Sequence, residues 1–278
     1  MAAVLSPLRS PLRSPLHSPL VGKWGASYTT EAEALFARFT TPPTAARKVL
    51  INSFIVSLKS AGVWTKLDAL WIMAAADSQA ARQNWKVDLY NLTAVSSPTF
   101  TTDRGFAGDG SASHLTTGFT PSTAGGQFAL NSSHLGVWSR TNAQTAGVAI
   151  GARTAAGSHQ SLIIIRSASD LEVHRLNQDA NGASSASTDS SGDFIARRSG
   201  AAATALLRNG TSISTGTVAS TALTTAGVVL GALNTGGVIG NFNNYQLAAA
   251  SIGASLSDAE VTAFYNAKLA YLQAVGAA

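Results

Sequence analysis

The sequence predicts a mainly β protein, a sandwich or jelly roll preceded by a small helical region and an extended N-terminal arm. Turn signals recur about every ten residues over 86–253, with short apolar or alternating runs between them. Helical spacing of apolar residues is confined to 29–85 and the C-terminal end, and proline takes every fourth position over 7–19. We therefore divide the chain into an arm (1–28), a helical region (29–85) and a sandwich with a closing helix (86–278).

The arm consists of Ser-Pro-Leu repeats that cover 6–20. The prolines exclude a helix and remove donors that a sheet ladder needs, and they hold the preceding residues extended, so we expect a polyproline-like strip of roughly 50 Å. Two interpretations remain open, a disordered tail and a strap whose leucines enter pockets on a partner while its arginines meet acidic groups. The regular leucines favour the strap, because a flexible linker does not need them. In the strap interpretation, the residues that anchor the arm to a partner are Pro7, Leu8, Arg9, Pro11, Leu12, Arg13, Pro15, Leu16, Pro19 and Leu20.

The helical region contains several short segments with apolar residues three and four positions apart. Thr41 before Pro42-Pro43 is expected to cap the second of them, and Gly62 is expected to end it. Helices this short require packing partners to be stable. The expected helical segments are 31–39, 49–58, 65–73 and 78–85.

The sandwich region carries its strongest local signal at Asn209-Gly210, which predicts a type I′ hairpin between two apolar runs. Ser257 and Glu260 have the spacing of a capping box and predict the start of the closing helix. The expected strands are 114–119, 127–130, 135–138, 147–150, 162–165, 171–174, 194–197, 204–207, 228–230 and 245–252.

Composition excludes several classes of protein. Only 12% of residues are charged, and the net charge of +5 reflects few acids rather than a basic stripe, which argues against nucleic-acid binding. Cysteine is absent, so disulfides and thiolate metal sites are excluded. The sequence contains no run of 18 apolar residues, so no membrane span is predicted. Prolines interrupt any signal-peptide pattern at the N-terminus.

A search for catalytic residues finds one close pair of acids on an expected strand, Asp170 and Glu172. Retaining glycosidases need two carboxyl groups about 5–5.5 Å apart, but a single pair without a third acid or flanking aromatics is a weak signal. The pattern favours an ordinary solvent-facing strand. The five histidines show no metal-ligand or nucleophile-activating spacing, and the acids are too scattered for a calcium loop. We therefore predict a protein that is not an enzyme and that carries no metal or cofactor.

Two clusters have the composition of a sugar site, an aromatic ring beside amide, imidazole or guanidinium groups. His134 and Trp138 are expected on one face of a strand, with Arg140 nearby, and Asn243 and Tyr245 form the second cluster. The ordinary alternatives are core or interface packing for Trp138 and turn formation for the asparagines.

The Arg208-Asn209-Gly210 hairpin, the Val228–Gly231 strand and Leu256-Ser257-Asp258-Ala259-Glu260 opening a last helix resemble concanavalin A-like, laminin-G-type jelly rolls. Residues 31–44, 67–85 and 91–110 are similar to proteins of tailed bacteriophages and prophages, and the Ser-Pro-Leu repeat fits that group. The resemblance covers most of the chain, but its motifs are structural and imply no particular ligand.

This resemblance implies a virion structural protein, a head fibre or decoration protein or a tail fibre, assembled in the host cytoplasm. Its expected partners are other virion proteins through the arm, further copies of itself (a trimer is typical of such fibres) and host-surface glycans. Two alternatives remain open. A free-standing lectin leaves the repeat without a purpose, and a polysaccharide-degrading enzyme requires acids that the pattern does not provide.

Overall fold

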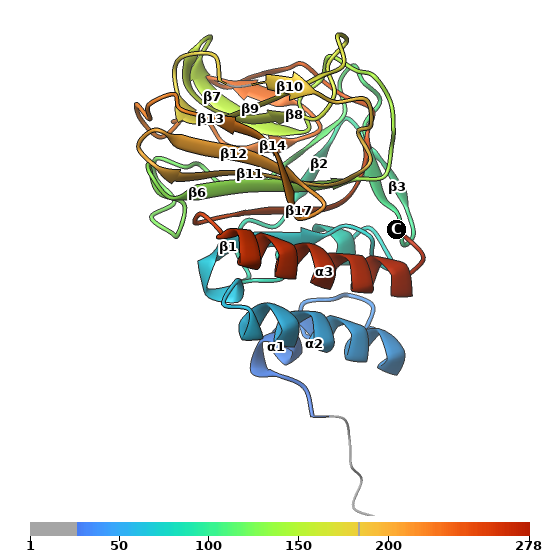
Figure 1. Cartoon of the computed structure of the whole chain (residues 1–278). Helices are drawn as coiled ribbons and strands as arrows, with labels where there is room; N and C mark the ends of the chain where they lie inside the picture. The colour runs from blue at the N-terminus through green and yellow to red at the C-terminus, as the bar shows by residue number, and fades with distance from the viewer. Residues whose placement is uncertain (1–26, 183) are drawn as a thin grey trace, which may run out of the picture.

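The computed structural model describes residues 27–182 and 184–278, and residues 1–26 of the N-terminal arm lie outside them. Two sheets are stacked as a sandwich, one helix covers the outer face of one sheet, and two further helices lie beyond that helix (Figure 1). This architecture confirms the predicted mainly β sandwich with a small N-terminal helical region and a C-terminal helix.

The first sheet, sheet A, has the strand order β13-β12-β11-β6-β17-β4-β3, and β1 pairs with the remaining length of β17. All its pairings are antiparallel. Its strands are β1 (Leu67–Ile72), β3 (Thr99–Thr101), β4 (Gly105–Ala107), β6 (Ser133–Ser139), β11 (Gly192–Gly200), β12 (Ala203–Arg208), β13 (Thr211–Gly216) and β17 (Gln246–Gly253).

The second sheet, sheet B, has the order β10-β9-β8-β7-β14-β5-β2, and the hairpin of β15 and β16 joins it alongside β7. The β15–β7 pairing is parallel, and the others are antiparallel. Its strands are β2 (Thr93–Val95), β5 (His114–Thr116), β7 (Ile150–Ala155), β8 (Ser158–Ile164), β9 (Leu171–Gln178), β10 (Ser184–Ala186), β14 (Val229–Leu230), β15 (Leu233–Thr235) and β16 (Val238–Gly240).

The hairpin between β12 and β13 turns at the expected place. Asn209 and Gly210 have φ angles of 50° and 83°, and positive φ at both positions defines the type I′ turn. The prediction from Asn-Gly is confirmed. The turn also places the Asn209 side chain against β11, where Asn209 Oδ1 accepts the backbone N–H of Asp193 at 2.9 Å.

The helices are α1 (Thr30–Phe36), α2 (Ala45–Ser60) and α3 (Asp258–Ala274), with single 3₁₀ turns η1 (Trp64–Lys66) and η2 (Ala80–Arg82). The capping box of Ser257 and Glu260 is present at α3. The predicted cap at Thr41 is wrong: Thr44 caps α2 and accepts the N–H of Arg47 at 3.2 Å. Pro42 and Pro43 therefore belong to the α1–α2 connection and not to the first turn of a helix.

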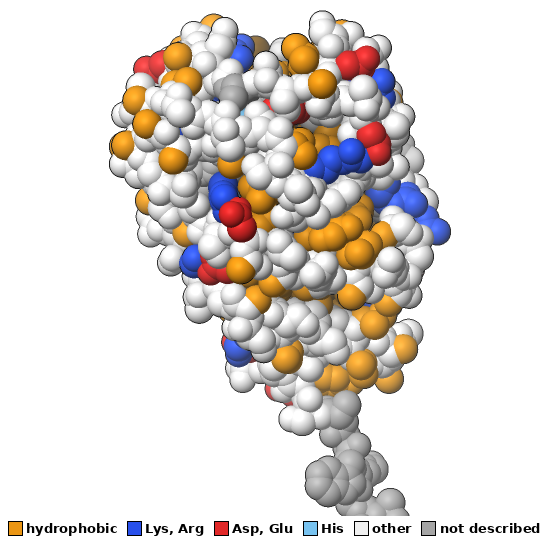
Figure 2. Space-filling view, in the orientation of Figure 1, with side chains coloured by type: hydrophobic (Ala, Val, Ile, Leu, Met, Phe, Trp, Pro, Cys, Tyr) orange, Lys and Arg blue, Asp and Glu red, His pale blue; other side chains and the backbone are white. Residues whose placement is uncertain are grey.

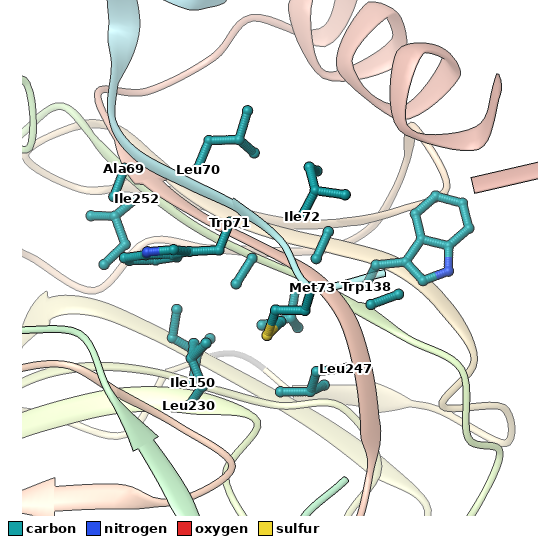
Figure 3. Close-up of a cluster of buried hydrophobic side chains, with 14 of the residues drawn as sticks. Ala69, Leu70, Trp71, Ile72, Met73, Trp138, Ile150, Leu230, Leu247 and Ile252 are labelled. Atoms are coloured by element: carbon teal, nitrogen blue, oxygen red, sulfur yellow. The ribbon is translucent and has the colours of Figure 1, made fainter. Parts of the chain in front are cut away.

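Residues 67–72 form strand β1, not the predicted helix. All but one of its residues are buried, so the segment reads as a continuous apolar run, which periodicity cannot tell from a buried helix. Ala69 and Trp71 face the interior of the sandwich, whereas Leu70 and Ile72 face the side on which α3 lies (Figure 3). β1 belongs to the region 29–85, and its pairing with β17 makes that region part of sheet A.

Sheet A is buried on both faces. All seven residues of β6 are buried, and so are seven of the eight in β17. On the inner face, Trp71 lies over Ile150 and Leu230 of sheet B (Figure 3). On the outer face, Trp138 of β6 stacks on Tyr265 of α3, with ring centroids 5.8 Å apart and planes at 9°. One apolar cluster consequently runs from Ala32 to Ala277 through helices and both sheets.

A buried ion pair fixes α3 on sheet A. Lys268 Nζ lies 2.5 Å from Asp193 Oδ1 of β11, and the two side chains are 3% and 1% exposed. Burial raises the pKa of Asp193 and lowers the pKa of Lys268, against the opposite pull of each partner's charge. Removing both charges from water costs more free energy than their mutual attraction returns, so the Lys268–Asp193 pair adds little net stability. We infer that its main effect is on the register of α3 on sheet A.

We predict that Lys268→Met lowers the free energy of unfolding by about 3–5 kcal/mol, because it leaves the Asp193 carboxyl buried alone. The double variant Lys268→Met/Asp193→Leu is expected to regain most of that loss, since no charge stays buried. Urea unfolding of the four proteins of this cycle measures both effects. Equal losses in the single and double variants would contradict the account.

The same variant carries a pH signature. Without Lys268, only desolvation acts strongly on Asp193, and its folded-state pKa rises further above the unfolded value. A carboxyl with a raised pKa contributes stability at low pH that is lost as pH rises through the folded-state pKa. The deficit of Lys268→Met is therefore smaller in acid than at pH 8.

Candidate functional site

The residues expected to anchor the arm lie outside the described residues, and their assignment stays a prediction. They are Pro7, Leu8, Arg9, Pro11, Leu12, Arg13, Pro15, Leu16, Pro19 and Leu20.

The first expected sugar cluster is covered by α3. His134 and Trp138 do share one face of β6, as the strand alternation predicts, but that face is the outer face of sheet A. Trp138 is 5% exposed, and His134 is fully buried, with Nδ1 2.5 Å from Ala254 O and Nε2 3.2 Å from Ser251 Oγ. The assignment of these two side chains to an exposed site is corrected: they pack between sheet and helix.

Arg140 is half-buried and holds the C-terminal end of the chain. Its Nε donates to Ala277 O at 2.5 Å, and its Nη1 donates to Gln246 Oε1 of β17. These donors are satisfied within the protein, so this guanidinium ties the C-terminus to sheet A.

The second expected sugar cluster is also internal. Asn243 is fully buried, donates to Val148 O at 2.6 Å and accepts the N–H of Tyr245 at 3.0 Å. Tyr245 is 1% exposed, its hydroxyl lies 3.3 Å from Ala143 O and 3.2 Å from Arg166 O, and burial raises its pKa. Asn243 and Tyr245 connect loops, which is the turn alternative, and their assignment to glycan contact is corrected.

The acid pair considered from the sequence is split. Asp170 has a φ of 54°, precedes β9 and bonds Arg166 Nε at 2.6 Å. Glu172 is fully buried beside His174, 3.2 Å from its Nδ1, and accepts the Ser185 hydroxyl at 3.0 Å. The two carboxyl groups therefore do not converge on one exposed face.

The charged groups of the described chain are scattered over its surface. On the face shown in Figure 2, Lys and Arg lie beside Asp and Glu at several places and form no stripe. Ion pairs of the described residues include Lys59 with Glu31 and Arg197 with Asp258. Over residues 27–182 and 184–278, no three His, Asp or Glu side chains are grouped to hold a metal ion. None of the helices in these ranges is long and apolar enough to cross a membrane.

The best-formed hollow lies at the helical end of the molecule. We call it the Trp85 hollow; its volume is about 170 Å³. It lies among the end of α1, the start of α2, the segment before η2 and the end of α3. Its walls are mainly apolar and aromatic, with Arg47 and Asp77 as the charged members: Phe39, Thr41, Pro42, Pro43, Thr44, Arg47, Ile51, Ala75, Ala76, Asp77, Ala80, Trp85 and Tyr271.

The polar groups of this hollow are held in place by their neighbours. Arg47 Nη2 lies 2.8 Å from Asp103 Oδ1, and its Nη1 donates to the Tyr271 hydroxyl at 3.3 Å. Asp77 accepts the N–H groups of Gln79 and Ala80. These bonds hold the Arg47 guanidinium and the Asp77 carboxylate in fixed orientations.

Trp85 forms a wall of a second hollow. This second one, the α1 hollow, has a volume of about 420 Å³ and includes Thr30, Glu31 and Ala34 of α1. The Trp85 ring is held edge-on by Phe54 and Tyr271, with centroids 5.5 and 5.4 Å away. Sequence reasoning missed both hollows, because the walls of the Trp85 hollow come from four separated segments and those of the α1 hollow from two. Trp85 at the end of the helical region was the single available signal.

Comparisons with known proteins place the fold. No family model matches the chain, and no curated protein matches it in sequence. Among solved structures, the chain is similar to a mutant of Trypanosoma rangeli sialidase with trans-sialidase activity, at a TM-score of 0.53 and 10% identity, over 81% of this chain and 39% of that one. A complex of Trypanosoma rangeli sialidase with 2,3-difluoro-KDN matches at 0.51 and 9% identity, over 78% and 39%.

A third similarity is to domain 4 of a GH43 extracellular arabinanase from Geobacillus stearothermophilus in complex with arabinotriose. It has a TM-score of 0.38 and 17% identity, over 72% of this chain and 98% of that one. The chain spans about two fifths of the sialidases that it matches. At these identities the sialidase matches show the fold.

The prediction that the chain is not an enzyme is contradicted by these comparisons, because two structures matched at TM-scores above 0.5 are those of a sialidase. The sequence argument depended on the spacing of acids along strands. That spacing carries no information on which proteins share the fold.

The burial of His134 leads to a pH prediction. Burial lowers its pKa from 6.5 to about 4, and the bond to Ala254 O opposes this shift only in part. A group with a lowered folded-state pKa contributes stability above its unfolded pKa that is lost as pH falls through the folded one. Between pH 6.5 and 4, His134 alone is expected to cost about 3 kcal/mol of unfolding free energy.

The control is His134→Gln, whose amide can still donate to Ala254 O but does not titrate. Its unfolding free energy should fall less steeply between pH 6.5 and 4 than that of the parent protein. Urea unfolding at several pH values measures the two slopes, and parallel slopes would exclude His134 as the titrating group.

Proposed function

We propose that this chain is a structural protein of a tailed-bacteriophage virion, a head fibre or decoration protein or a tail fibre, that is anchored by its Ser-Pro-Leu arm and displays the sandwich outward. The repeat over 6–20 and the resemblance of 31–44, 67–85 and 91–110 to phage proteins support this proposal. The lectin-like sandwich fold is compatible with it.

The observation that carries the proposal is that the chain enters the described structure at one end of the molecule and sheet B lies at the other. The described chain begins at Ser27 and enters α1 at the helical end, and sheet B lies at the opposite end, beyond α3 and sheet A (Figure 1). An arm attached to a particle surface would therefore hold the helical layer toward the particle and the outer loops of the sandwich away from it.

The surface of the helical layer supports a role for further copies of the chain. Val49 and Val56 on the solvent side of α2 are 48% and 41% exposed. A groove between α2 and α3 is lined by uncharged residues, among them Leu50 and Ala267. Contacts between copies, in a trimer or another symmetric assembly, would cover this face and explain why only 12% of the residues are charged.

Contact with host-surface glycans is the second part of the proposal. One of the sialidase structures of similar fold contains a sugar-acid ligand, 2,3-difluoro-KDN. The residues first expected to bind sugar are internal, so such contact would involve the exposed loops of sheet B, for example the β15–β16 hairpin, where Val238 is 73% exposed.

We predict that deleting residues 1–20 abolishes incorporation of the chain into particles while the soluble protein keeps its fold. A matched variant keeps every proline but changes Leu8, Leu12, Leu16 and Leu20 to Ser, and it should incorporate poorly if the leucines enter pockets. Particles are purified and their copy number is measured by quantitative mass spectrometry, with cryo-electron microscopy locating the sandwich. Normal incorporation of the deletion variant, or absence of the parent protein from particles, would favour a free-standing lectin.

A further inference from the structure

The Trp85 hollow is lined mainly by apolar and aromatic side chains. Trp85 itself is 2% exposed, and its ring is held edge-on by Phe54 and Tyr271. An occupant with apolar groups would cover this surface and remove it from water.

The walls select the chemistry of that occupant. Phe39, Pro42, Trp85 and Tyr271 form an apolar, aromatic surface around a space of about 170 Å³, room for one or two small side chains. Aromatic-lined grooves bind proline-rich segments in polyproline II geometry, which is already ordered and loses little entropy on docking.

The chain carries such a segment within reach. Leu20, the last residue of the Ser-Pro-Leu repeats, is seven residues before Ser27, where the described chain begins. Seven residues span about 22 Å in polyproline II geometry. Ser27 in turn is three residues before Thr30, which lines the α1 hollow on the other side of Trp85. The chain thus enters the described structure beside the wall that the two hollows share.

We propose that the last repeat of the same chain, Ser18-Pro19-Leu20, occupies the Trp85 hollow. Pro19 and Leu20 pack against the aromatic walls. The first three repeats, 6–16, stay available to a partner, and docking of the fourth determines the direction in which they leave the protein. This inference stands apart from the proposed function, because it holds whether or not the outer repeats meet a virion.

Cysteine cross-linking in the full chain tests the proposal, since the natural sequence has no cysteine. Leu20→Cys is combined with Ala76→Cys, an exposed position that lines the hollow. The matched control combines Leu20→Cys with Ala270→Cys, an exposed position on α3 next to Tyr271 but outside the hollow. Under mild oxidation, we expect the intramolecular disulfide to form at least tenfold faster in the first pair.

Equal rates in the two pairs would overturn the proposal, because they are what an undocked tether produces. Disulfide-linked dimers as the main product of the first pair would overturn it as well, since the occupant would then be the arm of a second copy. Non-reducing gels with mass spectrometry of the linked peptides separate these outcomes.

The indole N–H gives an independent readout without cysteines. In full-length protein labelled at tryptophan, the Trp85 indole resonance is assigned by its loss in Trp85→Phe. Leu20→Ser should shift this resonance because the apolar contact with the indole ring is lost, whereas Leu8→Ser should leave it unchanged. An unchanged Trp85 resonance in Leu20→Ser, or equal shifts in both variants, would contradict docking of the fourth repeat.

Discussion

The burial of sheet A on both faces is the constraint on which the rest of the structure depends. Its inner face packs on sheet B, as any sandwich requires, and its outer face packs on α3. α3 then offers its far side to α2, and α2 contacts α1. A strand from the helical region, β1, lies at the edge of β17 and continues this sheet. The helices are therefore a third layer of the sandwich core.

Because α3 covers the outer face of sheet A, polar residues of that face lie buried between the sheet and the helix. Apolar contacts alone do not direct a helix on a sheet, and the Lys268–Asp193 pair adds one specific polar contact between α3 and β11. His134, in the same layer, is kept neutral by burial and joins β6 to the chain after β17 through Ala254 O. Buried titratable groups with shifted pKa values often mark functional sites. In the described structure, however, Lys268, Asp193 and His134 are enclosed, and each contacts a polar partner inside the protein.

The sequence predicted the fold well wherever local rules decide. Asn209-Gly210 requires positive φ angles at both positions, and Ser257 with Glu260 satisfies the free donors of a helix start, so both elements occur where expected. Nonlocal packing was beyond these rules. Trp138 has the same alternation whether its face meets solvent or α3, and 67–72 reads alike as a helix or a doubly buried strand. The Trp85 hollow joins four distant segments, which no local pattern reveals.

Native-state hydrogen exchange on the full chain tests most directly whether helices and sandwich form one unit. If sheet A depends on α3 for its outer face, amides of β6, β17 and α3 must open together, with the same free energy and the same response to urea. The account predicts that single opening for all three elements. Exchange of α3 at a free energy several kcal/mol below that of β6 would instead show that the sandwich stands without its helical layer, and would contradict the account.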